Sequence, residues 1–178
     1  AAEIADSLAQ NKVFFQVYLK DRVYAPQDND YSLRYTRMTG IEVEKADIQE
    51  LLAREPEGLE KILCIGTEEQ LKEVEESLKK LYAEVVHITS SNNTNLEIVD
   101  QGVNKGVALR ALAEQLDVKP EEVMAIGDSL NDKEMIAFAG IGVAVENAHP
   151  QIKKTADYIT ASHVNDGVAQ AIEKFVLI

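Results

Sequence analysis

Apolar residues in the first half of the chain follow two different periods. One set recurs at the three- and four-residue intervals of a helix face: Leu71, Val74, Leu78 and Leu81. The preceding run Thr67-Glu68-Glu69-Gln70 is a capping box, so the pattern predicts a helix that begins near Thr67 and directs this stripe inward. Further along, Val86 and Ile88 alternate with polar neighbours, which is typical of a half-buried strand.

The other elements before residue 90 predict an α+β arrangement. Lys20-Asp21 separates two apolar runs and is a plausible hairpin turn. The stretch around Asp28-Asn29-Asp30 is polar and indicates a long loop between strands. Predicted helices cover residues 2–10 and 48–54, and predicted strands cover residues 13–19, 22–24, 61–65 and 84–89.

The second half alternates short buried strands with helices, the pattern of a parallel α/β sheet. Strands are predicted over residues 123–126, 140–145 and 158–160, and helices from Asn104-Lys105-Gly106 onward, over 132–139, after Pro150 through 156, and over 167–176. The first of these helices has an apolar face made of Leu109, Leu112, Ala113 and Leu116. The polar run Ser90–Thr94 is suited to a hinge, so we expect domains at 1–92 and 93–178.

Composition narrows the class of protein. The chain has 178 residues, 46% of them hydrophobic, and a formal net charge of −13. Such acidity argues against general nucleic-acid binding, which needs basic surface. No apolar run approaches the roughly 20 residues of a membrane span. The lone Cys64 lies in an apolar run and excludes an internal disulfide. We therefore expect a cytoplasmic protein that binds neither nucleic acid nor membranes.

Candidate chemistry lies in the turn Gly127-Asp128-Ser129-Leu130-Asn131-Asp132, which follows an apolar strand. The carboxyl edge of a parallel sheet is where open α/β folds bind ligands. Two carboxylates and an amide oxygen suit a hard cation such as Mg²⁺. The alternative is an ordinary turn in which Asp132 caps the next helix. Lys105 lies at a helix start, where the helix dipole disfavours a cation; it indicates a bound anion, or is simply a surface lysine.

Four motifs in order carry a resemblance to a known family: Asn104-Lys105-Gly106, Gly127 to Asp132, Gly142-Val143-Ala144-Val145-Glu146-Asn147-Ala148 and Asp166-Gly167-Val168. The segment from Leu96 onward resembles the second half of a haloacid dehalogenase-like (HAD) phosphatase of the Cof subfamily. The resemblance implies the C-terminal part of a Rossmann-like parallel-sheet core. Residues 1–92 resemble the family's α+β cap domain in length and pattern only.

The resemblance also implies a reaction, the Mg²⁺-dependent hydrolysis of small phosphate monoesters, typically sugar phosphates, through an aspartyl-phosphate. Asp128 and Asp132 would be the metal residues of this half. Lys105 would neutralise the phosphate, Asn131 would bind substrate, and Asp132 would also orient Lys105 or a metal-bound water. Lys105, Asp128 and Asp132 are thus the implied catalytic residues.

One part of the family pattern is absent from the sequence. The family's nucleophile and its acid/base are the two Asp residues of an Asp-x-Asp-Gly-Thr motif. The only Asp-x-Asp here, Asp28-Asn29-Asp30, follows Pro26-Gln27 and precedes Tyr31-Ser32. We therefore expect the chain alone to be inactive and to pair with a segment that carries the motif, or with itself. The competing hypothesis is a non-catalytic binding or interaction fragment with this fold.

Overall fold

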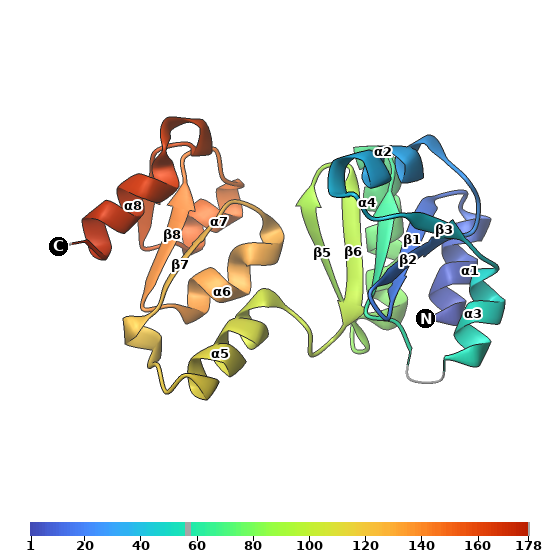
Figure 1. Ribbon diagram of the computed structural model, residues 1–178, viewed down its shortest axis with the longest axis horizontal. Helices are drawn as coiled ribbons and strands as arrows, with labels where there is room; N and C mark the ends of the chain where they lie inside the picture. Colours follow the sequence, from blue (N-terminus) through green and yellow to red (C-terminus); the bar gives the residue numbers. More distant parts are fainter. Residues whose placement is uncertain (56–57, 178) are drawn as a thin grey trace. The chain divides into compact units, whose positions relative to one another are not determined.

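The computed structural model describes residues 1–55 and 58–177 and divides the chain into two compact units, 1–101 and 102 onward (Figure 1). The predicted boundary at 92/93 instead falls inside a hairpin between β5 (Val86–Asn92) and β6 (Asn95–Asp100). Strand β6 also pairs with β4 (Lys61–Ile65), so it belongs to the first sheet. The polar run expected to form a hinge is therefore the end and turn of this hairpin.

The first unit is built on a six-stranded sheet with the order β3-β2-β1-β4-β6-β5. Its other strands are β1 (Phe14–Leu19), β2 (Arg22–Ala25) and β3 (Val43–Lys45). Neighbouring strands are antiparallel except for β2 and β3. Lys20 and Asp21 both have positive φ, 50° and 61°, as a tight hairpin turn requires, which confirms the predicted turn.

Three helices cover one face of this sheet: α1 (Ala2–Gln10), α3 (Ile48–Arg54) and α4 (Glu68–Tyr82). Phe15 and Val17 of β1 pack into the core beneath them. The capping box at Thr67 and Gln70 is confirmed. The predicted inward stripe is confirmed except at its end: Leu81 is 67% exposed, and the last turn of α4 contributes Tyr82 to the core instead.

Helix α2 (Asp30–Thr39) lies on the opposite face, where the sequence predicted only a loop. Tyr31 stacks on Phe14, and Tyr35 meets Tyr18 edge-on. Phe14 and Tyr18 alternate with Phe15 and Val17 along β1, so they point away from the other helices. The side chain of Asn29 caps α2 by accepting from the Tyr31 amide. The sequence pattern did not predict this helix because its only buried residue is Ser32, so α2 has no apolar face with helical spacing.

The second unit contains the predicted parallel sheet, and its strand order is β7-β8-β9: β7 (Met124–Gly127), β8 (Ile141–Val145) and β9 (Tyr158–Thr160). Its helices are α5 (Lys105–Gln115), α6 (Lys133–Phe138), α7 (Pro150–Thr155) and α8 (Gly167–Phe175). Short 3₁₀ turns are η1 (Pro120–Glu122), η2 (Leu130–Asp132) and η3 (His163–Asn165).

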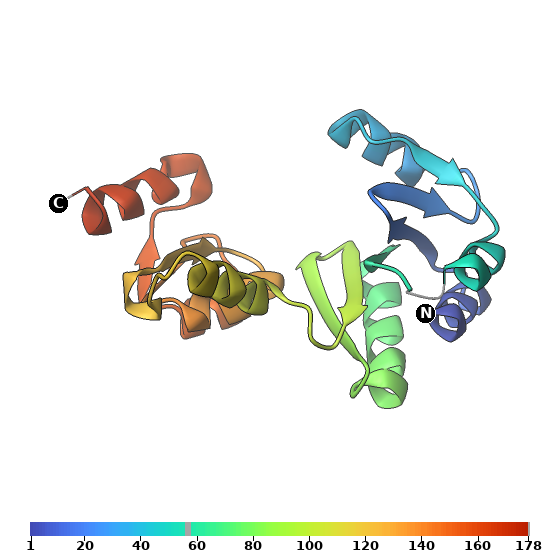
Figure 2. The same cartoon turned by 60° about the horizontal axis from the view of Figure 1, so that its bottom comes forward.

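The core of the second unit lies between the sheet and helices α6 and α7, around Ile136, Ala144 and Ile152. Helix α8 lies on the other side of the sheet (Figure 2). The predicted apolar face of α5 is only partly confirmed: Ala113 is buried, but Leu112 and Leu116 are 51% and 63% exposed. Among the described residues, no helix is long and apolar enough to cross a membrane.

Candidate functional site

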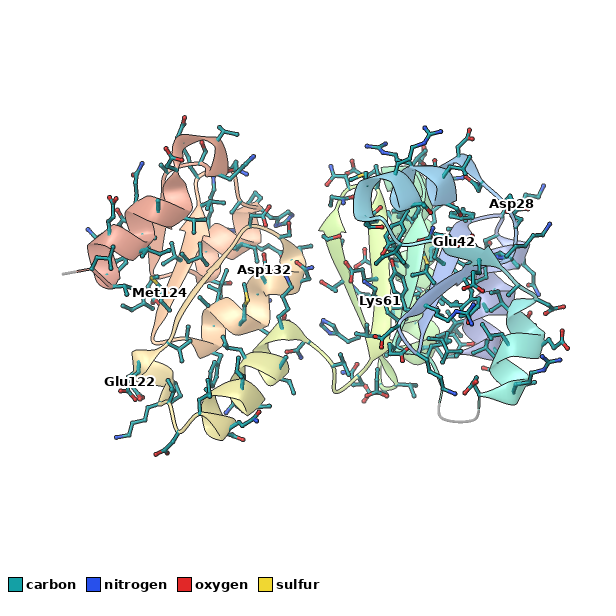
Figure 3. All side chains as sticks on the ribbon, in the orientation of Figure 1. Asp28, Glu42, Lys61, Glu122, Met124 and Asp132 are labelled. Atoms are coloured by element: carbon teal, nitrogen blue, oxygen red, sulfur yellow. The ribbon has the colours of Figure 1, made fainter. Side chains whose placement is uncertain are left out.

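The candidate site forms where β7 ends and the chain turns into η2. Asp132, labelled in Figure 3, is only 4% exposed. A Cβ atom on Gly127 would lie 2.5 Å from the Cβ of Asp132. A glycine is therefore needed at the end of β7, because any side chain there would displace the buried carboxylate.

Both oxygens of Asp132 accept hydrogen bonds. Oδ2 accepts from the backbone amides of Asp128 at 2.9 Å and Ser129 at 3.1 Å. Oδ1 accepts from Nζ of Lys105, which begins α5. Asp132 makes no side-chain cap to α6, so the simple interpretation as an N-cap of that helix is wrong. The structure thus brings together Lys105 and Asp132, two of the predicted catalytic residues.

These contacts decide the ionisation of Asp132. Burial alone would raise its pKa, but the hydrogen bonds from Lys105 and from the amides of Asp128 and Ser129 outweigh burial and lower the pKa below its ordinary value. Asp132 is therefore a fixed anion at neutral pH. The ammonium group of Lys105 pairs with this anion, while the Lys105 side chain remains 50% exposed to solvent.

Asp128 and Asn131 have side-chain oxygen atoms without a hydrogen-bond partner among the described residues. The backbone carbonyl of Asp128 accepts from the amide of His149, which ties the turn to the start of α7. Its side chain is exposed and has no hydrogen-bond or ion-pair partner within the described residues. Oδ1 of Asn131 is buried and equally unpartnered there. Asp128 and Asn131 are therefore the candidate ligand-binding side chains of the site, and carboxylate and amide oxygens suit a cation or a polar substrate.

The close approach of α5 to α6 supports Lys105. A Cβ on Gly106 would lie 2.7 Å from the backbone carbon and oxygen of Glu134, so only glycine permits this packing. Glu134 was not singled out from the sequence, yet its Oε2 atom is buried without a partner among the described residues. The signal that could have found it is its position two residues after Asp132, in the first turn of α6.

Metal binding by protein residues alone is incompletely supported. Within residues 1–55 and 58–177, no group of three or more His, Cys, Asp or Glu side chains could hold an ion. Asp128 and Asp132 are the two candidate carboxylates, and only Asp128 has both oxygens free of protein contacts. The Asp28-Asn29-Asp30 run lies in the first unit, where Asn29 caps α2.

A three-stranded parallel sheet with helices on both sides and a Lys–Asp pair at its carboxyl edge is typical of the α/β proteins that bind ligands at that edge. Within that class, residues 1–172 match the model of the haloacid dehalogenase-like hydrolase family. The chain belongs to this family, which confirms the resemblance and the fold class predicted from the motifs.

Two curated relatives come from Bacillus subtilis strain 168, and both are named 5-amino-6-(5-phospho-D-ribitylamino)uracil phosphatase. YcsE is 50% identical over 105 residues, which cover 59% of this chain and 41% of that protein. YitU is 29% identical over 182 residues, which cover 97% of this chain and 63% of that protein. This chain therefore spans less than two thirds of either relative.

Solved structures agree with the fold assignment. The crystal structure of TM0651 from Thermotoga maritima is similar with a TM-score of 0.75 at 34% sequence identity. The similarity covers 98% of this chain and 65% of that one. Both units of the chain therefore have counterparts in a solved structure.

Proposed function

We propose that the chain is part of a phosphatase that hydrolyses small phosphate monoesters with Mg²⁺. The observation that carries the proposal is the Lys105–Asp132 pair, anchored by two backbone amides at the carboxyl edge of β7. A buried carboxylate that is ionised at neutral pH and aims a lysine at an open sheet edge provides a compact cation for a phosphate dianion. The names of the two relatives support the same reaction class.

Each residue of the site takes a distinct part. Lys105 reduces the charge repulsion between the phosphate and an attacking carboxylate, and Asp132 orients Lys105. Asn131 donates or accepts a hydrogen bond at the substrate through its free amide. Asp128 would hold Mg²⁺, with Asp132 beside it, and the bound ion would supply further charge neutralisation. With one or two carboxylates available, we expect this chain alone to bind the ion weakly.

The attacking carboxylate is the part that we propose to lie outside this sequence. In the proposed reaction a carboxylate oxygen attacks phosphorus, the ester oxygen leaves with a proton, and water then releases inorganic phosphate from the acyl phosphate. No Asp-x-Asp-Gly-Thr occurs in the 178 residues. The single Asp-x-Asp run is used to start α2, which disfavours it as a replacement.

We also propose that the second unit binds a further polypeptide strand. Within the described sheet β7 pairs only with β8, so its other edge presents backbone groups that can pair again. Exposed apolar residues recur every four positions along this segment: Val168 and Ile172 on α8, and Val176 at the C-cap of that helix. A segment that carries the missing motif would suit this edge, and a second copy of the chain is the alternative occupant.

The proposal is tested by measuring phosphate release with and without Mg²⁺. The purified chain is assayed alone and after co-expression with the N-terminal segment of YcsE that precedes the matched region. We expect no turnover from the chain alone and Mg²⁺-dependent turnover from the pair. Lys105→Met and Asp128→Ala should abolish that turnover, whereas Lys154→Met, which changes an exposed lysine of α7, should leave it unchanged.

Two results would overturn this proposal. Turnover by the chain alone that Asp128→Ala abolishes would mean that the nucleophile lies within these residues. A folded, associated pair without activity on any phosphate monoester would favour the non-catalytic binding hypothesis instead.

A further inference from the structure

A cavity of about 360 Å³ lies in the first unit between α2 and the end of the sheet. Tyr31, Arg34 and Tyr35 of α2 form one wall, and Leu63 and Ile65 of β4 form the apolar floor. Asn95, at the start of β6, completes the rim. The volume is within the usual range for small-molecule sites, which is roughly 300–1,000 Å³. Nothing in the sequence pattern predicted this cavity, because its wall is the helix that the pattern missed.

The charge of the cavity differs from that of the chain. Acidic residues outnumber basic ones by 31 to 18 in the sequence, yet no acidic side chain lines the cavity. Arg34 is exposed and makes no ion pair or hydrogen bond with any described residue. Its guanidinium is therefore available to a ligand. The cavity suits a neutral or electron-rich group, since Arg34 attracts electron-rich atoms and no carboxylate in the lining would pair with a cation.

Two tyrosine rings are held in fixed positions at the wall. Tyr31 stacks on Phe14 with 5.7 Å between ring centroids and remains 42% exposed. Tyr35 meets Tyr18 edge-on at 6.3 Å. Because these contacts hold the rings before any ligand arrives, the entropy cost of binding against them is low. Aromatic walls of this kind favour a planar ring over a flexible polyol.

The rim offers one unsatisfied amide. Asn95 is half-buried and follows the strand alternation that places Leu96 in the helix-covered core, so its side chain lies on the α2 face. It has no side-chain hydrogen bond with any described residue. By contrast, Oδ1 of Asn92 already accepts from Thr94. A free carboxamide provides one donor and one acceptor, which match the adjacent N–H and C=O groups of an imide ring.

We infer that this cavity binds a planar imide ring of the pyrimidinedione type. The ring would lie against the tyrosine wall, pair its imide edge with Asn95 and direct a carbonyl to Arg34. If the ring is the organic part of the phosphorylated substrate, the assignment rests on the proposed function and names its substrate class. The ring occurs in the substrate named for both relatives, and one of these matches 97% of this chain.

Binding is measured by calorimetry on the 178-residue chain, with 5-amino-6-(D-ribitylamino)uracil as the probe, and the amide spectrum verifies folding. We expect a Kd on the order of 100 μM, typical of a ligand of this size. Asn95→Ala and Arg34→Gln should each weaken binding about tenfold, the effect of one lost charged or buried hydrogen bond. Arg37→Gln is the matched control, because Arg37 lies on the same helix outside the cavity. Uracil should compete with the probe, and ribitol should not.

The inference is overturned if the folded chain shows no binding at a probe concentration ten times the expected Kd, on the order of 1 mM. It is also overturned if both cavity variants bind as the parent does, or if ribitol competes as well as uracil. The probe carries no phosphate, so this outcome is independent of turnover. Ring binding without phosphatase activity in the co-expressed pair would sink the proposed function alone, and activity without ring binding would sink this inference alone.

Discussion

Helices α4 and α5 have similar apolar patterns but different surroundings. On α4, Leu78 is 1% exposed beneath a six-stranded sheet. On α5, Leu112 and Leu116 are 51% and 63% exposed. The same type of residue is core in one unit and surface in the other. The second unit therefore holds its candidate site less by apolar packing than by polar anchors and glycine contacts around Asp132.

The difference in burial between α4 and α5 is tested most directly by replacing one leucine of each helix with alanine. Leu78→Ala should destabilise the first unit by about 2–5 kcal/mol, because it removes buried methyl groups and leaves a cavity. Leu112→Ala should change the stability of the second unit by no more than about 0.5 kcal/mol. Urea unfolding followed through assigned amide signals of each unit measures both. Equal costs would show that the apolar face of α5 is covered in solution.

The glycine contacts provide a second comparison. Gly106→Ala places a Cβ 2.7 Å from the backbone of Glu134, so α5 and α6 must separate. We expect a loss of about 1–3 kcal/mol in the second unit, as for other overpacked sites. Gly66→Ala in the first unit is the comparison, since its nearest neighbour, at 3.2 Å, is a side-chain atom, Oε1 of Gln70, which accepts from the Thr67 amide in the capping box of α4. Hydrogen exchange should quicken around Lys105 in the first variant and only near Thr67 in the second.

The sequence predicted the second unit better than the first, for a physical reason. Strands buried on both faces, such as β8, read as continuous apolar runs with glycine at their ends, and two carboxylates directly after the apolar strand β7 indicate a polar site at the sheet edge. Helix α2 was invisible because it rests on the sheet through Tyr31, Ser32 and Tyr35, which form no apolar period. The unit boundary failed because Ser90 and Asn92 are polar strand residues.

Within the site, the sequence could place Lys105 at a helix start but could not show what it contacts. The contact with Asp132 depends on two glycines: Gly106 lets α5 approach the backbone of α6, and Gly127 leaves room for the side chain of Asp132. The burial of Asp132 was equally unpredictable, since nearby Asp128 belongs to the same turn and is exposed. Which of two neighbouring carboxylates is a structural anchor and which faces a ligand was decided by packing.

The difference between buried Asp132 and exposed Asp128 can be tested by measuring stability as a function of pH. The folded-state pKa of Asp132 is lowered, so its ionised form stabilises the fold above its unfolded pKa of about 3.9, and this stabilisation is lost as pH falls through the folded value. The loss should be about 1–3 kcal/mol, the range for hydrogen bonds to a charged group. Asp132→Asn should remove this acid-dependent part of the stability curve, because the amide cannot titrate, and should lower stability at neutral pH. Asp128→Asn should change the curve less than Asp132→Asn does, since the Asp128 side chain makes no hydrogen bond or ion pair with any described residue. Unfolding by urea between pH 2 and pH 7, monitored in the second unit, distinguishes the two carboxylates; identical curves for both variants would contradict the anchor role of Asp132.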